Sequence, residues 1–559
     1  MGKKYFKSIE ETFGKKSFFY LFVLLIGLII NGLFELIGVG TLIVIVNLIS
    51  NSETSCTNEG ILNNFINLCS FDYFQIIIFS LIIFCFKAFY QVLIQIFKSY
   101  FVSEAIYIYL NKAYSLIIKL KQDQVDNLDL NKINTIFAKE FDVIFNSFLD
   151  KLLDLITESI VLIFMLCFLI LIIPEHTFYI MILIIIILIF YLRINTKKTQ
   201  SSGTNRTSSL ISINSIVNDT FINSRVYKIF SNRLSQISKF NKVVRFFVKA
   251  NVYHFLIIRI PRIIFENGLI VIILLSLLIS SYLYSDEQIF YYFSIYGLVF
   301  LRLYPAISRI KISLDTCLYR YSSFNSSLSI IKDLKNKSEI NHKTLEIIPN
   351  KNVNIEKLNI YYGNNNIIKN QNLIIEPNKY YLITGKSGAG KSTLINFICG
   401  FIKADFIFKQ KKYRNSYINL KNISYVSQKV TLLDNTIYKS LLLERKINRK
   451  KIKNILNELK LSHLITKLNK KPNFDNNDLS LGEIQRLNIA RAFLSEFDTL
   501  VLDEPLSSVD KKNREIIIKF LKKFKGKKTI IMSSHIIDKS DDFDYILKIE
   551  NTNISIKKI

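Results

Sequence analysis

The sequence predicts a multidomain chain, in which an all-α domain of six membrane-spanning helices precedes an α/β domain built around a glycine-rich turn. Three observations support this class. Long apolar runs fill the chain up to about residue 330 and are short and interrupted afterwards. Lys and Arg gather in alternate connections between the runs. The glycine-rich turn lies between a strand pattern and a helix pattern at residues 385–392. We therefore place the helical domain at 1–335, a linker at 336–349 and the α/β domain at 350–559.

The six apolar runs have the length that a helix needs to cross a bilayer, about 20 residues. Several of them continue into amphipathic stretches, so we expect helices that extend well past the membrane. The approximate cores of the runs are residues 18–49, 74–96, 153–173, 178–194, 268–284 and 289–303.

The distribution of basic residues gives the orientation. The connection 51–72 contains no Lys or Arg, and neither do the short turns at 174–176 and 285–287. The long connections 98–151 and 193–259 are rich in both. Because basic connections stay on the cytoplasmic side, both termini and the α/β domain are predicted to be cytoplasmic. The first apolar run has no small-residue cleavage site after it, so we expect an anchor rather than a signal peptide.

The overall charge and the cysteines limit the choice of partners. The net charge is +29, from 73 Lys and Arg against 44 Asp and Glu. Because the basic residues concentrate in cytoplasmic connections, anionic lipid head groups explain this excess better than a nucleic acid does. No nucleic-acid-binding motif is present, so we expect no nucleic-acid partner. Cys56 and Cys69 share the first external loop, where a disulfide and two free thiols both fit the sequence.

Basic residues interrupt or flank the predicted spans. Charges inside a membrane are costly, so they usually face the interior of a helix bundle or an aqueous cavity. We predict a basic cavity that binds an anionic head group. Two alternatives stay open: a basic residue at the membrane boundary can extend to the lipid head groups, and Arg262 can pair with Glu266 one turn away. The predicted substrate-binding residues are Lys87, Arg259, Arg262, Arg302 and Arg309.

The glycine-rich turn reads Gly-Lys-Ser-Gly-Ala-Gly-Lys-Ser, a complete P-loop with a strand pattern before it and a helix pattern after it. Its glycines let backbone N–H groups turn toward a phosphate at the helix N-terminus. Lys391 is predicted to bind the β- and γ-phosphates of ATP, and Ser392 to bind Mg²⁺. The predicted phosphate-binding residues are Gly385, Lys386, Ser387, Gly388, Ala389, Gly390, Lys391, Ser392 and Thr393.

Further polar residues, each following an apolar strand pattern, are predicted to complete this site. Asp503 is expected to hold Mg²⁺, and Glu504 to polarise the attacking water. Gln428 is expected to reach both the metal and the water. His535 is expected to contact the γ-phosphate. Tyr362 precedes the P-loop and is expected to stack on adenine.

The segment Leu479-Ser480-Leu481-Gly482-Glu483 resembles the signature motif of ATP-binding-cassette (ABC) proteins. The other motifs follow the order of that family across residues 350–559, including a turn at 507–510 after the Asp-Glu pair. Six spans before one cassette resemble a half-size exporter with the type I exporter fold, also called the type IV ABC fold. The resemblance covers essentially the whole chain. It implies an ATPase that drives transport across a bacterial inner membrane, with ATP and Mg²⁺ as cofactors.

In that family the signature motif of one subunit closes over the ATP that another subunit holds. The resemblance therefore implies a second half-transporter subunit, with a homodimer expected and a heterodimer as the alternative. It also implies that Ser480, Gly482 and Glu483 contact the nucleotide. Short helices near 128–137 and 213–221 are expected to transmit movement from the ATPase domain.

Two residues depart from the family pattern. Leu481 stands where Gly is usual, and Glu483 where Gln is usual. Because Leu does not adopt a positive φ without strain, we expect a different local backbone at Leu481. Neither departure touches the predicted catalytic carboxylates.

A closer resemblance is to the flippase of bacterial protein N-glycosylation, which moves lipid-linked oligosaccharide diphosphates. It rests on residues 259–262, 301–306 and 321–328 and on the basic residue Lys87. It implies a polyisoprenyl diphosphate glycan, or a related anionic amphiphile, as the transported molecule. An exporter of a peptide, a lipid or an apolar compound is the main alternative. An ATP-gated channel or a regulatory subunit is a third class, which the presence of Glu504 disfavours.

Overall fold

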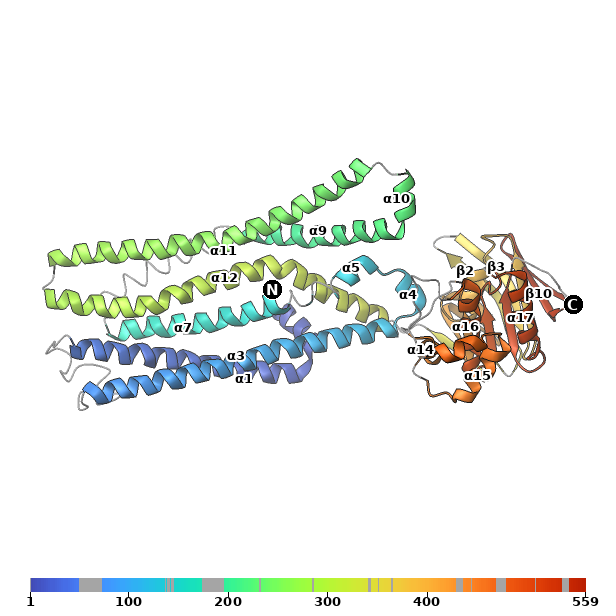
Figure 1. Ribbon diagram of the computed structural model, residues 1–559, viewed down its shortest axis with the longest axis horizontal. Coiled ribbons are helices and arrows are strands. Elements are labelled where there is room, and N and C mark those ends of the chain that lie inside the picture. Colours follow the sequence, from blue (N-terminus) through green and yellow to red (C-terminus); the bar gives the residue numbers. More distant parts are fainter. Residues whose placement is uncertain are drawn as a thin grey trace. The chain divides into compact units, whose positions relative to one another are not determined.

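The computed structural model describes residues 2–49, 73–135, 137, 141, 145–172, 196–230, 233–283, 286–339, 343–349, 351–362, 365–428, 436–443, 445–468, 479–507, 509–534 and 542–559. The chain forms two compact units (Figure 1). The first unit consists of Met1–Leu120 and Leu128–Ser338, and the second of Lys121–Asn127 and Glu339–Ile559.

Long helices make up the first unit (Figure 1). Within it α1 packs against α3 and α7, and α9 packs against α11. The long helices are α1 (Gly2–Ile49), α3 (Tyr73–Lys119), α7 (Asp150–Ile172), α9 (Thr196–Ile222), α11 (Arg233–Leu283) and α12 (Asp286–Glu339). The short elements are α5 (Leu130–Thr135), the π-helix η4 (Phe145–Leu149) and α10 (Ser224–Phe230).

Apart from residues 173 and 284, these helices contain five of the six predicted spans. The remaining span, 178–194, lies outside the described residues, as do residues 173 and 284, Cys56 and Cys69. Within the described part of the chain, two segments are long and apolar enough to cross a membrane, Phe19–Leu42 in α1 and Phe74–Lys119 in α3. Only 11% of the most apolar window of the α3 segment is buried. A core helix of a soluble protein buries such a surface, so lipid or another chain is needed to cover α3.

Small side chains bring α9 and α12 unusually close. A Cβ atom added to Gly203 would lie 2.0 Å from the backbone oxygen of Tyr319. Next to this contact, the hydroxyl oxygens of Thr207 and Ser323 lie 2.7 Å apart. The absence of a side chain at Gly203 therefore sets the distance between the two helices.

Two sheets form the framework of the second unit. The six-stranded sheet has the order β11-β10-β4-β9-β8-β7, in which only β11 runs antiparallel to its neighbour. The five-stranded sheet has the order β1-β6-β5-β2-β3 and is antiparallel except for the β1–β6 pair. The strands are β1 (Thr344–Ile347), β2 (Val353–Tyr362), β3 (Asn365–Ile375), β4 (Tyr380–Gly385), β5 (Ala404–Phe408), β6 (Lys411–Leu420), β7 (Ile423–Val426), β8 (Thr499–Leu502), β9 (Thr529–Ser533), β10 (Tyr545–Glu550) and β11 (Asn553–Lys558).

The neighbouring parallel strands β8 and β9 are buried along their whole length, which explains their unbroken apolar runs. Helices on both sides of the six-stranded sheet complete two hydrophobic clusters, one containing Leu500 and Leu502 and the other Val501. The helices of this unit are α13 (Lys391–Ile398), α14 (Ile437–Leu442), α15 (Arg449–Glu458), the 3₁₀ helix η5 (Ser462–Lys467), α16 (Leu481–Leu494) and α17 (Lys511–Lys522).

The predicted linker at 336–349 holds the end of α12 and strand β1, which pairs with β6.

The short helix expected near 128–137 is present as α5 (Leu130–Thr135), and its role in transmitting movement stays a prediction. The helix α4 (Gln122–Asp126), rather than 128–137, belongs to the second unit. The carboxylate of Asp123 there accepts a 2.6 Å hydrogen bond from the hydroxyl of Tyr417, and its N–H donates to the oxygen of Phe401. The predicted short helix at 213–221 is the end of the long helix α9, and the separate short helix that follows is α10.

Candidate functional site

The P-loop is the tight turn that joins β4 to α13. Gly385 lies so close to β10 that a Cβ atom would be 2.6 Å from the oxygen of Ile549. Gly390 has φ 101° and is the N-cap of α13, and a Cβ there would lie 2.5 Å from the side chain of Ile367. Side chains at these two positions would clash with β10 and with Ile367, so glycine lets the loop adopt this conformation at the helix N-terminus, where an anion binds.

Lys391 and Ser392 begin α13. The ammonium group of Lys391 donates to the backbone oxygens of Gly385, at 3.0 Å, and of Lys386, at 3.2 Å. Burial lowers the pKa of Lys391, and the charges of Glu504 and Asp503 oppose this shift. The lysine is therefore held across the mouth of the loop, in the position from which it can reach a bound phosphate.

Asp503 follows β8 at the same edge of the sheet. One of its carboxylate oxygens accepts hydrogen bonds from the hydroxyls of Ser392, at 3.3 Å, and Ser533, at 2.8 Å. Burial raises the pKa of this carboxyl, and the hydrogen bonds from Ser533 and Ser392 offset part of the shift. Sequence reasoning assigned no role to Ser533, because a serine at the end of an apolar strand carries no motif.

Glu504 is held in an uncommon backbone conformation, with φ 48°. Its N–H donates a 2.8 Å hydrogen bond to the hydroxyl of Ser533. Its carboxylate accepts a 2.9 Å hydrogen bond from the amide of Gln428. The structure thus joins Ser392, Asp503, Glu504 and Gln428 in one hydrogen-bonded group, as the motif order predicts.

Two residues predicted for this site cannot be placed in it. His535 lies outside the described residues, and so does the side chain of Tyr362, whose backbone ends β2.

The signature segment starts α16. Ser480 is the N-cap, its hydroxyl accepts from the N–H of Glu483, and its own N–H donates a 2.8 Å hydrogen bond to that carboxylate. A ring nitrogen of His463 lies 2.7 Å from the other carboxylate oxygen. Leu481 is the first helical residue, with an exposed side chain and no positive φ. Leu481 thus avoids the positive φ that would strain it, and a local backbone that differs from the family pattern stays a prediction.

In the first unit, three predicted substrate residues surround two glutamates that sequence reasoning did not single out. The carboxylate of Glu35, on α1, lies 2.8 Å from the ammonium of Lys87 and 2.9 Å from the guanidinium of Arg302. It also accepts a 2.9 Å hydrogen bond from the amide of Gln91. The Glu35 side chain is only 5% exposed.

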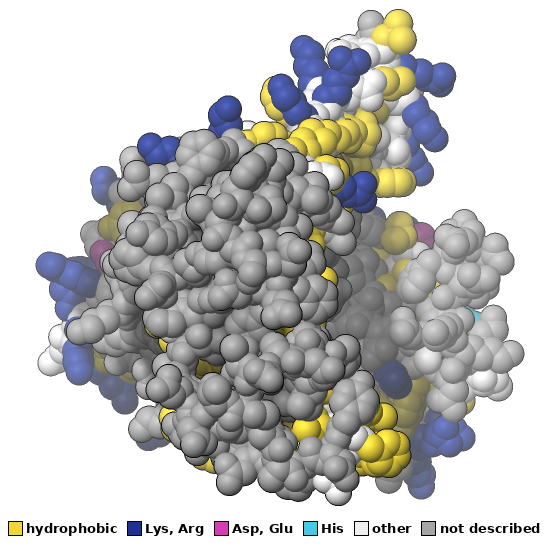
Figure 2. Space-filling model, turned by 90° about the vertical axis from the view of Figure 1, so that its left-hand side faces the viewer, with side chains coloured by type: hydrophobic (Ala, Val, Ile, Leu, Met, Phe, Trp, Pro, Cys, Tyr) yellow, Lys and Arg dark blue, Asp and Glu magenta, His cyan; other side chains and the backbone are white. Residues whose placement is uncertain are grey.

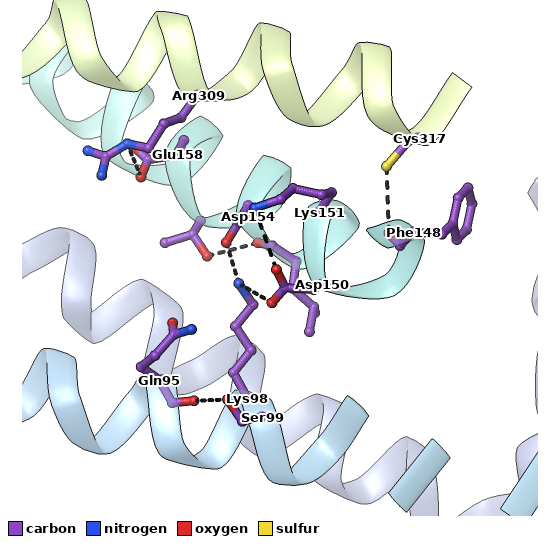
Figure 3. Close-up of polar contacts among 12 residues, drawn as sticks. Gln95, Lys98, Ser99, Phe148, Asp150, Lys151, Asp154, Glu158, Arg309 and Cys317 are labelled. Carbon is purple, nitrogen blue, oxygen red and sulfur yellow. Dashed lines mark hydrogen bonds and ion pairs between the residues drawn. The ribbon is translucent and has the colours of Figure 1, made fainter. Parts of the chain in front are cut away.

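Glu158, on α7, is the second glutamate. Its carboxylate lies 3.0 Å from the guanidinium of Arg309 and 3.7 Å from that of Arg302 (Figure 3 shows the Arg309 pair). Single acidic residues within apolar runs were the signal that could have found Glu35 and Glu158. We call Lys87, Arg302, Arg309, Glu35 and Glu158 the buried charge cluster after its two buried glutamates, although the side chain of Arg309 at its edge is 51% exposed.

The two remaining predicted substrate residues are not part of this cluster among the described contacts. Arg259, on α11, is exposed and lies over the ring of Phe255, 6.0 Å from its centre. The side chain of Arg262 lies outside the described residues.

The two units define a P-loop ATPase attached to a bundle of membrane helices. Residues 368–507 match the family described as ABC transporter. The chain is 30% identical over 213 residues to the energy-coupling factor transporter ATP-binding protein EcfA1 of Thermotoga maritima, covering 36% of this chain and 80% of that protein. The chain belongs to the ABC transporter family.

Longer relatives extend the match into the helices. A putative export ATP-binding/permease protein of Rickettsia conorii is 25% identical over 554 residues, 92% of either chain. The multidrug resistance-like ATP-binding proteins MdlB of two Buchnera aphidicola subspecies match this chain over 38% and 59% of their own lengths, at 29% and 28% identity. A solved structure of a bacterial Atm1-family ABC exporter with ATP bound superimposes with a TM-score of 0.72 at 15% identity, covering 96% of this chain and 94% of that one. The fold is therefore that of an ABC exporter.

Proposed function

We propose that this chain is one half of a dimeric exporter that uses ATP hydrolysis to move an anionic amphiphile across a bacterial inner membrane. The observation that carries the ATPase part is the hydrogen-bonded group of Ser392, Asp503, Glu504 and Gln428 beside the P-loop. The transported molecule that we propose is a lipid-linked oligosaccharide diphosphate or a related molecule.

The residues present fit ATP and Mg²⁺. The Ser392 hydroxyl and the Asp503 carboxylate, 3.3 Å apart, are the hard oxygen ligands that Mg²⁺ prefers. Gln428, whose amide nitrogen is hydrogen-bonded to Glu504, would add its amide oxygen. The metal, when bound, neutralises charge on the phosphates. Lys391 neutralises further phosphate charge, and the carboxylate of Glu504 orients and polarises the attacking water. His535 and Tyr362 keep their proposed roles at the γ-phosphate and the adenine.

In this proposal a second copy of the chain completes the ATP-binding site. Ser480, Gly482 and Glu483 would then face the ATP bound by the other copy. An apolar surface around α10 supports an assembly, because Phe221, Ile229 and Phe230 are between 74% and 81% exposed. Figure 2 shows hydrophobic and basic side chains side by side on the projecting arm at the top of the view, formed by α10 and the adjoining ends of α9 and α11.

The buried charge cluster supports an anionic amphiphile. Lys87, Arg302 and Arg309 come from two helices and converge on one region of the bundle. The similarity of residues 259–262, 301–306 and 321–328 to the flippase of protein N-glycosylation favours a diphosphate glycolipid within this class. Export of a peptide or an apolar compound is the second candidate, and one observation favours it: Glu35 and Glu158 already neutralise most of the basic charge.

The proposal is tested with the full-length protein in nanodiscs. We expect ATP hydrolysis that farnesyl diphosphate stimulates and that farnesol and neutral peptides do not. Stimulation by farnesol alone, or by a peptide alone, would favour the second candidate. Two differently tagged copies that fail to co-purify would argue against the homodimer.

A further inference from the structure

Acidic residues form a stripe along α7. Asp150, Asp154 and Glu158 follow one another at four-residue spacing, which places them on one face of the helix. Figure 3 shows this face turned toward α3 on one side and α12 on the other. Each acidic residue faces a basic residue, so the bundle contains a column of ion pairs rather than a bare basic cavity.

The ion pairs at the two ends of this column differ in how well their atoms are hydrogen-bonded. Lys98 donates a hydrogen bond to the carboxylate of Asp154 and lies 3.0 Å from that of Asp150, and Lys151 also donates to Asp154, at 2.7 Å. We call this end closed, because both carboxylate oxygens of Asp154 accept a hydrogen bond from a lysine.

The pairs around Arg302 are incomplete. Its Nε lies 2.9 Å from an oxygen of Glu35, within ion-pair distance, but makes no directed hydrogen bond among the described residues. The Oε2 of Glu158, 3.7 Å from Arg302, likewise accepts no hydrogen bond among them. A buried donor and a buried acceptor without directed hydrogen bonds reduce the cost of exchanging one partner for another.

The number of charges in the cluster indicates how an anionic ligand can bind there. Three basic side chains face two carboxylates in the buried charge cluster, so it carries one excess positive charge. A polyanion that entered between them would face both carboxylates at close range, and like charges repel strongly where water is scarce. A diphosphate can therefore bind Lys87 and Arg302 only if it takes the place of a carboxylate.

We propose that Glu35 and Glu158 are specificity-determining residues, which hold the basic side chains when the site is empty and compete with the diphosphate of the transported lipid when it binds. This inference rests on the proposed function. In the empty transporter the glutamates compensate two of the three basic charges, which would otherwise be costly inside the bundle. A monophosphate has few charged oxygens, so its interaction with the basic side chains is little stronger than that of the carboxylate it displaces. A diphosphate has more charged oxygens and interacts more strongly, so the competition selects diphosphates over monophosphates.

The test measures equilibrium binding of radiolabelled farnesyl diphosphate and farnesyl monophosphate to the full-length protein in nanodiscs without ATP. We expect E35Q to bind both probes more tightly, with the Kd of the monophosphate lowered about tenfold and that of the diphosphate lowered much less, so that most of the preference for the diphosphate is lost. Weaker or unchanged binding by a folded E35Q protein would overturn the proposal. E158Q on the other helix is the second variant, with the same expectation, should E35Q not fold.

The matched control is D154N, which removes a carboxylate of the same bundle from the closed end of the column. Its Kd for both probes is expected to equal that of the unaltered protein. A D154N protein that gained affinity as E35Q does would overturn the competition, since a general change in bundle charge would then explain the gain. An unaltered protein that binds neither probe would overturn the proposed anionic cargo as well, whereas normal binding that E35Q leaves unchanged overturns only this inference.

Discussion

The amide of Gln428 donates a 2.9 Å hydrogen bond to the carboxylate of Glu504, although 76 positions separate the two residues. They follow β7 and β8, which are neighbouring parallel strands. Because parallel strands end at the same edge of a sheet, residues from distant motifs meet there. The position of Glu504 beside Gln428 makes its carboxylate the one to test for a role in hydrolysis.

We expect Glu504→Gln to lower the rate of ATP hydrolysis by about a hundredfold or more, the usual contribution of a group that orients and deprotonates water. Binding of ATP should persist, because Lys391 and the P-loop backbone are unchanged. Phosphate release and equilibrium nucleotide binding measure the two effects. Glu515→Gln, at an exposed position on α17, is the control and should hydrolyse ATP normally. Hydrolysis by Glu504→Gln at the normal rate would remove Glu504 from the mechanism.

The raised pKa of Asp503 gives a pH dependence. Burial raises this pKa above its ordinary value of 3.8, so the folded site keeps a proton that the unfolded chain has already released. The contribution of Asp503 to stability is therefore most favourable at low pH and declines as the pH rises from 3.8 through the raised pKa. We expect Asp503→Asn to be more stable than the unaltered protein at pH 7 without nucleotide, while losing Mg²⁺-dependent hydrolysis. Unfolding curves at several pH values test this, and a lower stability at pH 7 would contradict it.

Much of the nucleotide site was predictable, because a P-loop is a local motif with a strand before it and a helix after it. The hydrogen bonds that orient its side chains were not predictable. Ser533 and His463 act through partners 30 and 20 positions away, which no spacing rule connects. The same holds for Glu35 and Glu158, whose roles depend on which helices lie beside them.

The helix that docks on the ATPase unit was predicted only approximately. A five-residue helix such as α4 has too little periodicity for its boundaries to be read from the sequence. Its placement depends on the tertiary hydrogen bond between Asp123 and Tyr417.

Glu483 stabilises the start of α16 through its reciprocal hydrogen bonds with Ser480. We expect Glu483→Ala to lower the free energy of unfolding by about 1 kcal/mol, the usual effect of a lost cap. Glu483→Gln keeps an acceptor for the N–H of Ser480 and should lose much less. Chemical denaturation compares the two variants, and equal losses would show that the charge of Glu483, rather than the capping box, is what stabilises the helix.

The close contact at Gly203 makes it sensitive to one added methyl group. The Cβ of Gly203→Ala would clash with the backbone oxygen of Tyr319, which cannot move without shifting α12. We expect a loss of about 1–3 kcal/mol, the range for overpacked sites. Gly297→Ala is the matched control, because it is also in a helix and its Cβ would have no neighbour within 4 Å. Thermal unfolding of both variants tests the contact, and a fully stable Gly203→Ala protein would mean that the helices are further apart.

The pair formed by Arg302 and Glu35 can be tested by a double-mutant cycle. Arg302→Gln alone leaves two buried carboxylates with less compensation, and a broken buried ion pair costs about 3–5 kcal/mol. Adding Glu35→Gln removes one of these carboxylates, so we expect the double variant to be more stable than Arg302→Gln. A coupling energy of about 1–3 kcal/mol is the size expected for residues in contact. Unfolding in the same detergent supplies the four free energies. Additive losses would mean that Arg302 and Glu35 do not stabilise each other, and competition between Glu35 and a diphosphate for Arg302 would then have no physical basis.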